Sequence, residues 1–177
     1  KRLGRLQKCL DAVFACVQVK DGDAGCIAKA GKTCDKAFAA LPGDGAKLPA
    51  AIAKACGDSV LEAADLLDED GLGFGNEDKA CERVGAAAPT DAASVAACVA
   101  AAHVCRADAA LGVEVPRAAE LLARVGRDES ELPCVVYAAG APGGLGDPKR
   151  AKLAAKCESA VKKAGAKLLN GEVKTVP

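Results

Sequence analysis

Ten cysteines are the feature that most constrains what this chain of 177 residues can fold into. Their number is even and they are spread from Cys9 to Cys157, which is typical of a disulfide framework made in an oxidising compartment. A structural zinc site would need ligand pairs two to four residues apart, and the sequence contains no CxxC pair. We therefore expect about five disulfides. We also expect a secreted, extracellular or cell-surface location, with the periplasm as the other option.

The N-terminal region predicts a helical hairpin. Apolar residues recur there at spacings of three and four, the period of an amphipathic helix. They are Leu3, Leu6, Leu10, Val13 and Val17. Asp21-Gly22-Asp23 interrupts this pattern, and an alanine-rich segment then runs from Ala24 to Leu41, where alanine favours a second helix.

The cysteines of this hairpin are placed symmetrically about its turn. Counted from Asp21, Cys16 and Cys26 both lie five residues away, whereas Cys9 lies twelve back and Cys34 thirteen forward. Antiparallel helices place equidistant residues side by side. We therefore predict two nested disulfides, Cys9–Cys34 and Cys16–Cys26.

The pairing of the other six cysteines stays open, including whether any bond is intermolecular. These are Cys56, Cys81, Cys98, Cys105, Cys134 and Cys157. Cys157 is best placed to reach a neighbouring chain, because it is isolated beyond the Gly- and Pro-rich segment 133–146. Within the chain, Cys134 and Cys56 are equally acceptable partners for it.

The predicted fold class is all-α, a multi-helix array of helical hairpins stapled by disulfides. A last helix is expected to open at Asp147-Pro148, to carry Leu153, Cys157, Val161, Ala164 and Leu168, and to stop at Asn170-Gly171. An interior helix should begin after Thr90 or Asp91. Alanine helices bury few methylenes, at roughly 0.8 kcal/mol each. Disulfides at about 2 to 4 kcal/mol each would offset so shallow a core.

We expect three regions within one continuous domain. The stapled hairpin and a short third helix occupy residues 1–57, and a central helical region with an acidic Gly-rich loop occupies 58–146. A basic helix and tail occupy 147–177. Apolar stretches such as 92–104 are shorter than the roughly 20 residues that span a bilayer, so we expect no membrane span. Because the chain begins at Lys1, we expect either a removed signal peptide or a piece of a longer protein.

Few residues are suited to catalysis. His103 is the only imidazole, and its spacing from Cys98 and Cys105 points it away from the helix face that the two sulfurs share. The sequence has no GxSxG motif, no P-loop and no GxGxxG after a strand. We therefore expect no catalytic residue, no cofactor and no enzymatic activity.

The acidic Gly-rich loop around Gly71 has two interpretations, a calcium-binding loop or a solvated turn. With Gly71 as the turn glycine of an EF-hand loop, Asp68, Asp70 and Glu77 take positions three, five and twelve. Leu66 then takes position one, where a carboxylate belongs. We therefore expect no metal site, and these three acids are the calcium candidates.

Charge is balanced over the whole chain, with 24 Lys and Arg against 24 Asp and Glu, which argues against nucleic-acid binding. It is unevenly placed, because residues 58–78 hold eight acids and no base, whereas residues 147–177 hold eight bases and three acids. We interpret these two charged segments either as solvated faces or as complementary docking surfaces, which would meet within the chain or between subunits. The candidate contacts are Lys156, Lys162, Lys163, Lys167, Asp65, Asp68 and Asp70.

The first hairpin is similar to disulfide-stapled helical hairpins such as the twin CX9C proteins and the plant hairpinins. Its six and seven residues between cysteines differ from their nine or three, so their functions are not carried over. The recurrent Lys-Cys step, as in Lys8-Cys9 and Lys156-Cys157, resembles Cys-rich, Ala-rich secreted or surface helical proteins of GC-rich bacteria. That resemblance implies export.

These features favour an exported, non-enzymatic structural or interaction protein, such as a self-assembling subunit of an extracellular filament, matrix or surface layer. Its partners would be further copies of itself or other surface proteins. The alternative is a monomeric helical carrier that holds a small apolar ligand between alanine-lined helices.

Overall fold

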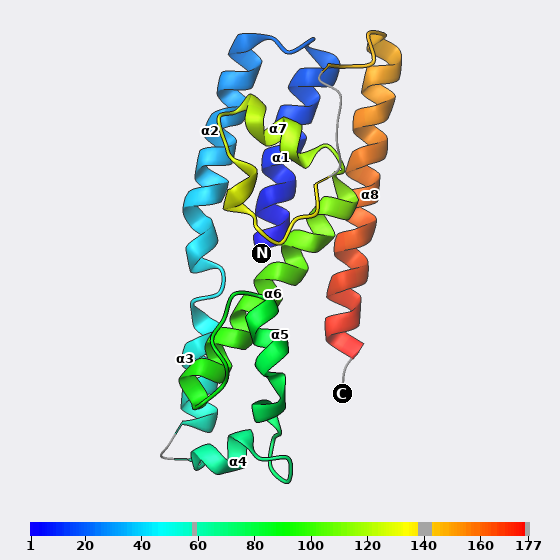
Figure 1. Ribbon diagram of the computed structural model, residues 1–177. Coiled ribbons are helices and arrows are strands. Elements are labelled where there is room, and N and C mark those ends of the chain that lie inside the picture. The colour runs from blue at the N-terminus through cyan, green and yellow to red at the C-terminus, as the bar shows by residue number, and fades with distance from the viewer. Residues whose placement is uncertain (58–59, 138–142, 176–177) are drawn as a thin grey trace. The chain divides into compact units, whose positions relative to one another are not determined.

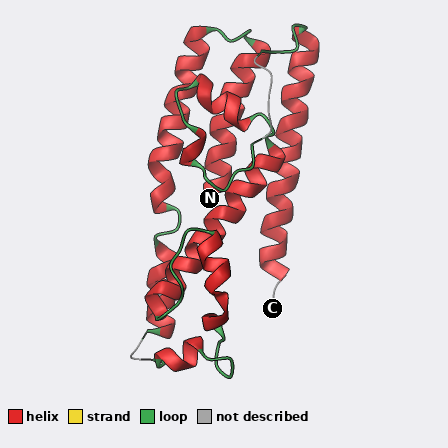
Figure 2. Cartoon of the chain, in the orientation of Figure 1, coloured by secondary structure: helices red, strands yellow, loops and turns green. Residues whose placement is uncertain are grey.

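The computed structural model describes residues 1–57, 60–137 and 143–175, and every regular element within these ranges is a helix (Figure 1, Figure 2). The all-α fold class is therefore confirmed. The α-helices are α1 (Arg2–Val19), α2 (Ala24–Ala40), α3 (Lys47–Cys56), α4 (Ala63–Leu67), α5 (Asp78–Arg83), α6 (Ala92–Glu114), α7 (Ala118–Arg124) and α8 (Pro148–Thr175). Three short 3-10 helices are η1 (Leu41–Gly43), η2 (Phe74–Glu77) and η3 (Glu129–Glu131).

The chain forms two compact units. Unit 1 combines Lys1–Leu41 with Ala107–Pro177, and unit 2 comprises Pro42–Arg106. These boundaries differ from the regions 1–57, 58–146 and 147–177 expected from composition. The reason is that the N-terminal and C-terminal parts of the chain pack into one core. Composition along the sequence does not reveal which distant segments pack together.

Unit 1 is built around α1, which lies between α2 and α8 and is also contacted by α7 (Figure 1). The predicted apolar period of α1 forms the centre of the core, where Leu6, Leu10, Val13 and Val17 are buried. α7 closes this core with two adjacent leucines, Leu121 and Leu122, which are fully buried.

The hairpin of α1 and α2 carries both predicted disulfides, Cys9–Cys34 and Cys16–Cys26, so these two predictions are confirmed. Its turn is compact because Asp21 and Gly22 both adopt positive φ, a region that Asp and Gly tolerate better than most residues. The carboxylate of Asp23 then accepts a hydrogen bond from the Cys26 amide at 2.7 Å and caps α2. Cap and disulfide therefore fix the same end of the hairpin.

Unit 2 holds a disulfide that sequence spacing left open. Cys81 of α5 is bonded to Cys98 of α6 and is fully buried. Asp91 caps the start of α6, because its carboxylate accepts a hydrogen bond from the Ser94 amide at 2.7 Å. That hydrogen bond lowers the pKa of Asp91, and the expected start of this helix is confirmed.

The last helix is longer than the sequence suggested. The stop expected at Asn170-Gly171 is wrong, because α8 continues to Thr175. A glycine costs only about 1 kcal/mol in a helix, and the good helix formers before it sustain the helix. α6 spans 23 residues and includes the apolar stretch 92–104. Among the described residues it alone has the length and composition of a membrane-crossing helix, a test that core helices of soluble proteins also pass.

Candidate interaction site

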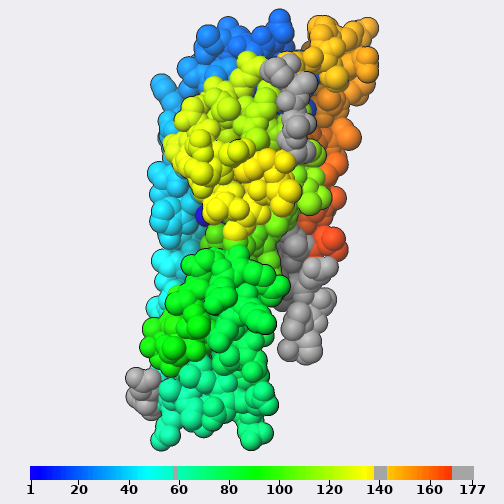
Figure 3. Space-filling view, viewed as in Figure 1, coloured from blue at the N-terminus to red at the C-terminus, as the bar shows by residue number. Residues whose placement is uncertain are grey.

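α8 presents its apolar residues to solvent. Leu153, Val161 and Leu168 are 64%, 49% and 64% exposed, and Cys157 and Ala164 are exposed with them. Spacings of three and four place all five on one helix face, which we call the α8 stripe. In Figure 3 the surface of α8, orange to red, lies along the edge of unit 1. Contiguous apolar surface of this kind commonly marks an interaction site.

The opposite face of α8 is polar and points into unit 1. Lys162 is only 2% exposed, and its ammonium group pairs with the carboxylate of Asp11 on α1 and with Glu158 at 3.0 Å. Burial raises the pKa of Glu158, and the hydrogen bond with Lys162 opposes part of that rise. Lys162, one of the candidate contacts, therefore uses its charge within the chain, on α1 and on α8 itself.

A second polar contact fixes α8 at the end of α6. The side-chain amide of Gln7 donates to the carboxylate of Glu114 at 2.5 Å and to the Lys162 carbonyl at 3.4 Å. Gly165 makes room for this arrangement, because a Cβ at that position would overlap the Glu114 carboxylate. Polar partners on α1 and α6 thus select which face of α8 turns inward.

Lysines flank the α8 stripe. Lys156, Lys163 and Lys167 are exposed, as are Lys149, Arg150 and Lys152 in the first turns of the helix. Between residues 149 and 168 the sole acid is Glu158, which is paired with Lys162. The stripe is therefore an apolar face with a positively charged border, and an apolar centre beside polar residues is the usual anatomy of a protein interface.

The acidic segment, defined here as residues 60–78 of unit 2, has the opposite character. Its seven acids are all exposed: Glu62, Asp65, Asp68, Glu69, Asp70, Glu77 and Asp78. Two large apolar residues among them, Val60 and Leu72, are more than half exposed. Asp65 has a structural role as well, because its carboxylate accepts from the Glu62 amide at 3.0 Å in the capping box of α4. Asp58, part of the predicted acidic run, lies outside the described residues.

The calcium candidates do not converge on a site. Asp68, Asp70 and Glu77 are exposed, and the Asp68 carbonyl accepts from the amides of Gly71 and Gly73 at 3.0 and 2.9 Å, which closes the loop on itself. Within the described residues no three His, Cys, Asp or Glu side chains are arranged to hold a metal ion. His103, the other candidate for chemistry, is exposed on α6.

Eight of the ten cysteines are oxidised. Cys105 and Cys134 are disulfide-bonded, in addition to the three pairs already described. Cys56, at the end of α3, and Cys157, in the α8 stripe, are free thiols, half-buried and exposed respectively. The sequence left the pairing of both cysteines open. Cys157 lies in the α8 stripe, and Cys56 lies just before the acidic segment in the sequence.

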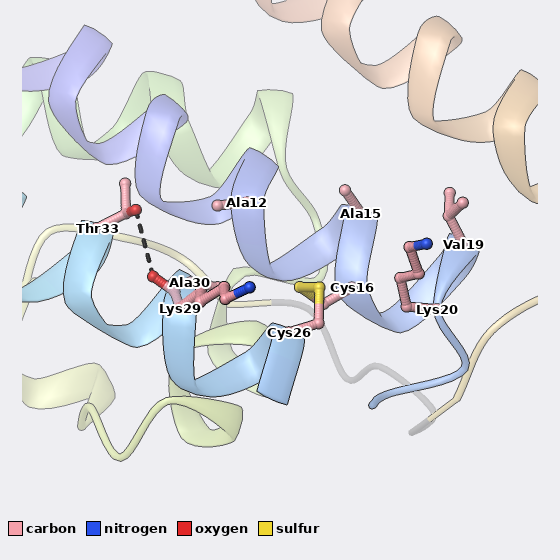
Figure 4. Close-up of a pocket in the computed structure, with 9 residues that line it drawn as sticks. All are labelled: Ala12, Ala15, Cys16, Val19, Lys20, Cys26, Lys29, Ala30 and Thr33. Carbon is pink, nitrogen blue, oxygen red and sulfur yellow. Dashed lines mark hydrogen bonds between the residues drawn. A yellow bond between two sulfur atoms is a disulfide. The ribbon is translucent and has the colours of Figure 1, made fainter. Parts of the chain in front are cut away.

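A groove of about 370 Å³ runs between α1 and α2 (Figure 4). Its lining is mainly apolar, with Ala12, Ala15 and Ala30 beside the Cys16–Cys26 disulfide. Figure 4 shows the amines of Lys20 and Lys29 at this surface, and Thr33 donates to the Lys29 carbonyl at 3.5 Å. No signal in the sequence separated these alanines from the many others.

No protein family, no curated protein and no solved structure matches this chain. The fold and its disulfides define the class as an all-α, disulfide-rich protein. Intramolecular disulfides at this number are typical of extracellular and other oxidising compartments.

Proposed function

We propose that this chain is an exported, non-enzymatic structural or interaction protein that associates with copies of itself or with other surface proteins. A subunit of an extracellular filament, matrix or surface layer fits this description. The observation that carries the proposal is the α8 stripe, because its large apolar side chains are exposed on a helix whose other face is anchored by ion pairs. Full burial of a Leu or Val side chain contributes about 1.5–3 kcal/mol, so a partner on this face would be stabilised.

The first test is the assembly state of the unreduced, chromatographed chain. Light scattering and negative-stain microscopy of the same sample should show long or ordered assemblies. A discrete monomer near the chain mass of 17.6 kDa, persisting at high concentration, contradicts self-association.

A set of serine variants assigns the assembly to the α8 stripe. Leu153→Ser/Val161→Ser/Leu168→Ser should abolish assembly and leave the monomer folded, because the three side chains contribute little to the core. The matched control is Val113→Ser/Val136→Ser, since both valines are exposed but lie off α8. The control should assemble as the unchanged chain does.

The groove between α1 and α2 favours a second candidate function, a monomeric carrier of a small apolar ligand. Its volume falls within the range of small-molecule pockets, and its alanine lining suits an apolar ligand. An apolar fluorescent probe should then bind the oxidised monomer with one-to-one stoichiometry. Ala15→Leu, which fills the groove, should weaken that binding, whereas Ala28→Leu on the exposed side of α2 should not.

A further inference from the structure

We infer that the α8 stripe of one copy docks on the acidic segment of a second copy, and that Cys157 of the first forms a disulfide with Cys56 of the second. This inference rests on the proposed self-association and names the two surfaces that meet. A contact between two different surfaces of identical chains repeats from copy to copy and builds either an open filament or a closed ring.

Charge complementarity identifies the partner surface. The rim of the α8 stripe carries six exposed bases, and its sole acid is already paired with Lys162. Two α8 stripes placed face to face would therefore bring like charges together, which costs free energy. The acidic segment instead offers seven exposed acids and no base.

Both surfaces also carry unburied apolar side chains. On α8 these are Leu153, Val161 and Leu168, and on the acidic segment they are Val60 and Leu72. Docking would bury the two sets against each other with the charges arranged around them. This combination of apolar centre and opposite rims is what a specific contact between proteins requires.

The two free thiols lie on these same surfaces. Cys157 is an exposed member of the α8 stripe. Cys56 ends α3 just before the acidic segment, and the amides of Val60 and Leu61 donate to the Gly57 carbonyl at 2.7 and 3.1 Å, which keeps Val60 within one turn of Cys56. Docking of the two surfaces therefore brings one thiol of each copy toward the other.

The cross-link requires an oxidant, which we take to be a low-molecular-weight disulfide. One small disulfide accepts two electrons and two protons from the Cys157 and Cys56 thiols and leaves as two small thiols. One bond between the two Sγ atoms forms, and the bond of the small disulfide breaks.

Two single variants of the full chain test the pairing in a buffer of oxidised and reduced glutathione. Cys56→Ser keeps only the thiol of α8, and Cys157→Ser keeps only the thiol beside the acidic segment. Each variant alone should stay monomeric on a non-reducing gel, whereas an equimolar mixture should give a covalent dimer and nothing larger. A peptide map of that dimer should join the Cys157 and Cys56 peptides. A dimer of Cys56→Ser alone, or a mixture that stays monomeric, overturns the inference.

Charge reversal tests the docking that precedes the bond. Lys156→Glu/Lys163→Glu in the Cys56→Ser chain should slow dimer formation in the mixture by about tenfold or more at low salt. Lys32→Glu/Lys36→Glu, exposed on α2, changes the net charge equally and should leave the rate within about twofold. Equal slowing by both pairs would overturn docking at α8.

Light scattering separates this inference from the function on which it rests. If the unchanged chain assembles but the mixture gives no dimer, self-association stands and the assigned contact fails. If the unchanged chain stays monomeric in every measurement, both fail.

Discussion

The guanidinium of Arg2 forms two hydrogen bonds with the carboxylate of Asp108, at 2.6 and 2.8 Å, and ties the start of α1 to α6 within unit 1. Asp108 is fully buried, whereas the Arg2 side chain is 14% exposed. A bidentate pair of this kind satisfies both oxygens of a carboxylate that water cannot reach. Arg2 therefore compensates the charge of Asp108 in the core.

Replacement of Arg2 should therefore be costly. Arg2→Met removes both of these hydrogen bonds from a buried carboxylate, and we expect a loss of about 3 kcal/mol in the free energy of unfolding. The double variant Arg2→Met/Asp108→Leu should recover most of that loss, since neither charge remains. Urea denaturation measures the unfolding free energy of both variants, and unchanged m values show that the denatured states are comparable. A single variant as stable as the unchanged chain would contradict the role given to this pair.

Gly165 should not tolerate a side chain. In Gly165→Ala the new methyl group overlaps the Glu114 carboxylate and displaces it from Gln7; we expect a net loss of about 1–2 kcal/mol in unfolding free energy, because helix propensity returns about 1 kcal/mol of the steric cost. Gly4→Ala in α1 is the matched control, because its Cβ meets open space. That control should stabilise the chain by about 0.5–1 kcal/mol through helix propensity. Thermal unfolding of both variants gives the comparison, and equal midpoints would refute the steric argument.

Glu158 should make stability depend on pH. Burial raises its pKa in the folded chain above the unfolded value, so the folded state holds this proton to higher pH. The resulting stabilisation is complete below about pH 4, where the unfolded carboxyl is also protonated, and is lost as pH rises through the folded pKa. The unfolding free energy of the unchanged chain minus that of Glu158→Gln should therefore fall, toward more negative values, as pH rises above about 4. Denaturant titrations at each pH measure it, and a difference that grows with pH would have the wrong sign.

The two hairpin disulfides should contribute unequally. They close loops with sequence separations of 25 for Cys9–Cys34 and 10 for Cys16–Cys26. Loop entropy predicts a loss of about 3 kcal/mol for removal of the shorter one, and about 0.8 kcal/mol more for the longer. Double alanine variants of each pair, unfolded in urea, test the order. If removal of Cys16–Cys26 cost more, entropy in the unfolded chain would not be the main contribution.

The sequence was sufficient for the helical class and for the N-terminal hairpin. Helix propensity and apolar period are local properties, and a short turn at Asp21 forces two helices to run antiparallel. Equidistant cysteines therefore had to meet, and their pairing followed from counting. The start of α6 at Asp91 was predictable for the same reason, because a helix cap involves neighbours in the sequence.

The orientation of α8 was decided only in the tertiary structure. By period alone, Leu153, Val161 and Leu168 form the face that a soluble helix would bury, yet they lie in solvent. The polar face turns inward because Lys162 forms an ion pair with Asp11 on α1, and because the absence of a side chain at Gly165 leaves room for the Glu114 carboxylate. These partners lie far from α8 in the sequence, so no local sequence pattern predicts the contacts with them. Local chemistry thus determined which segments are helices, and contacts between distant segments decided which of their faces remain free to bind.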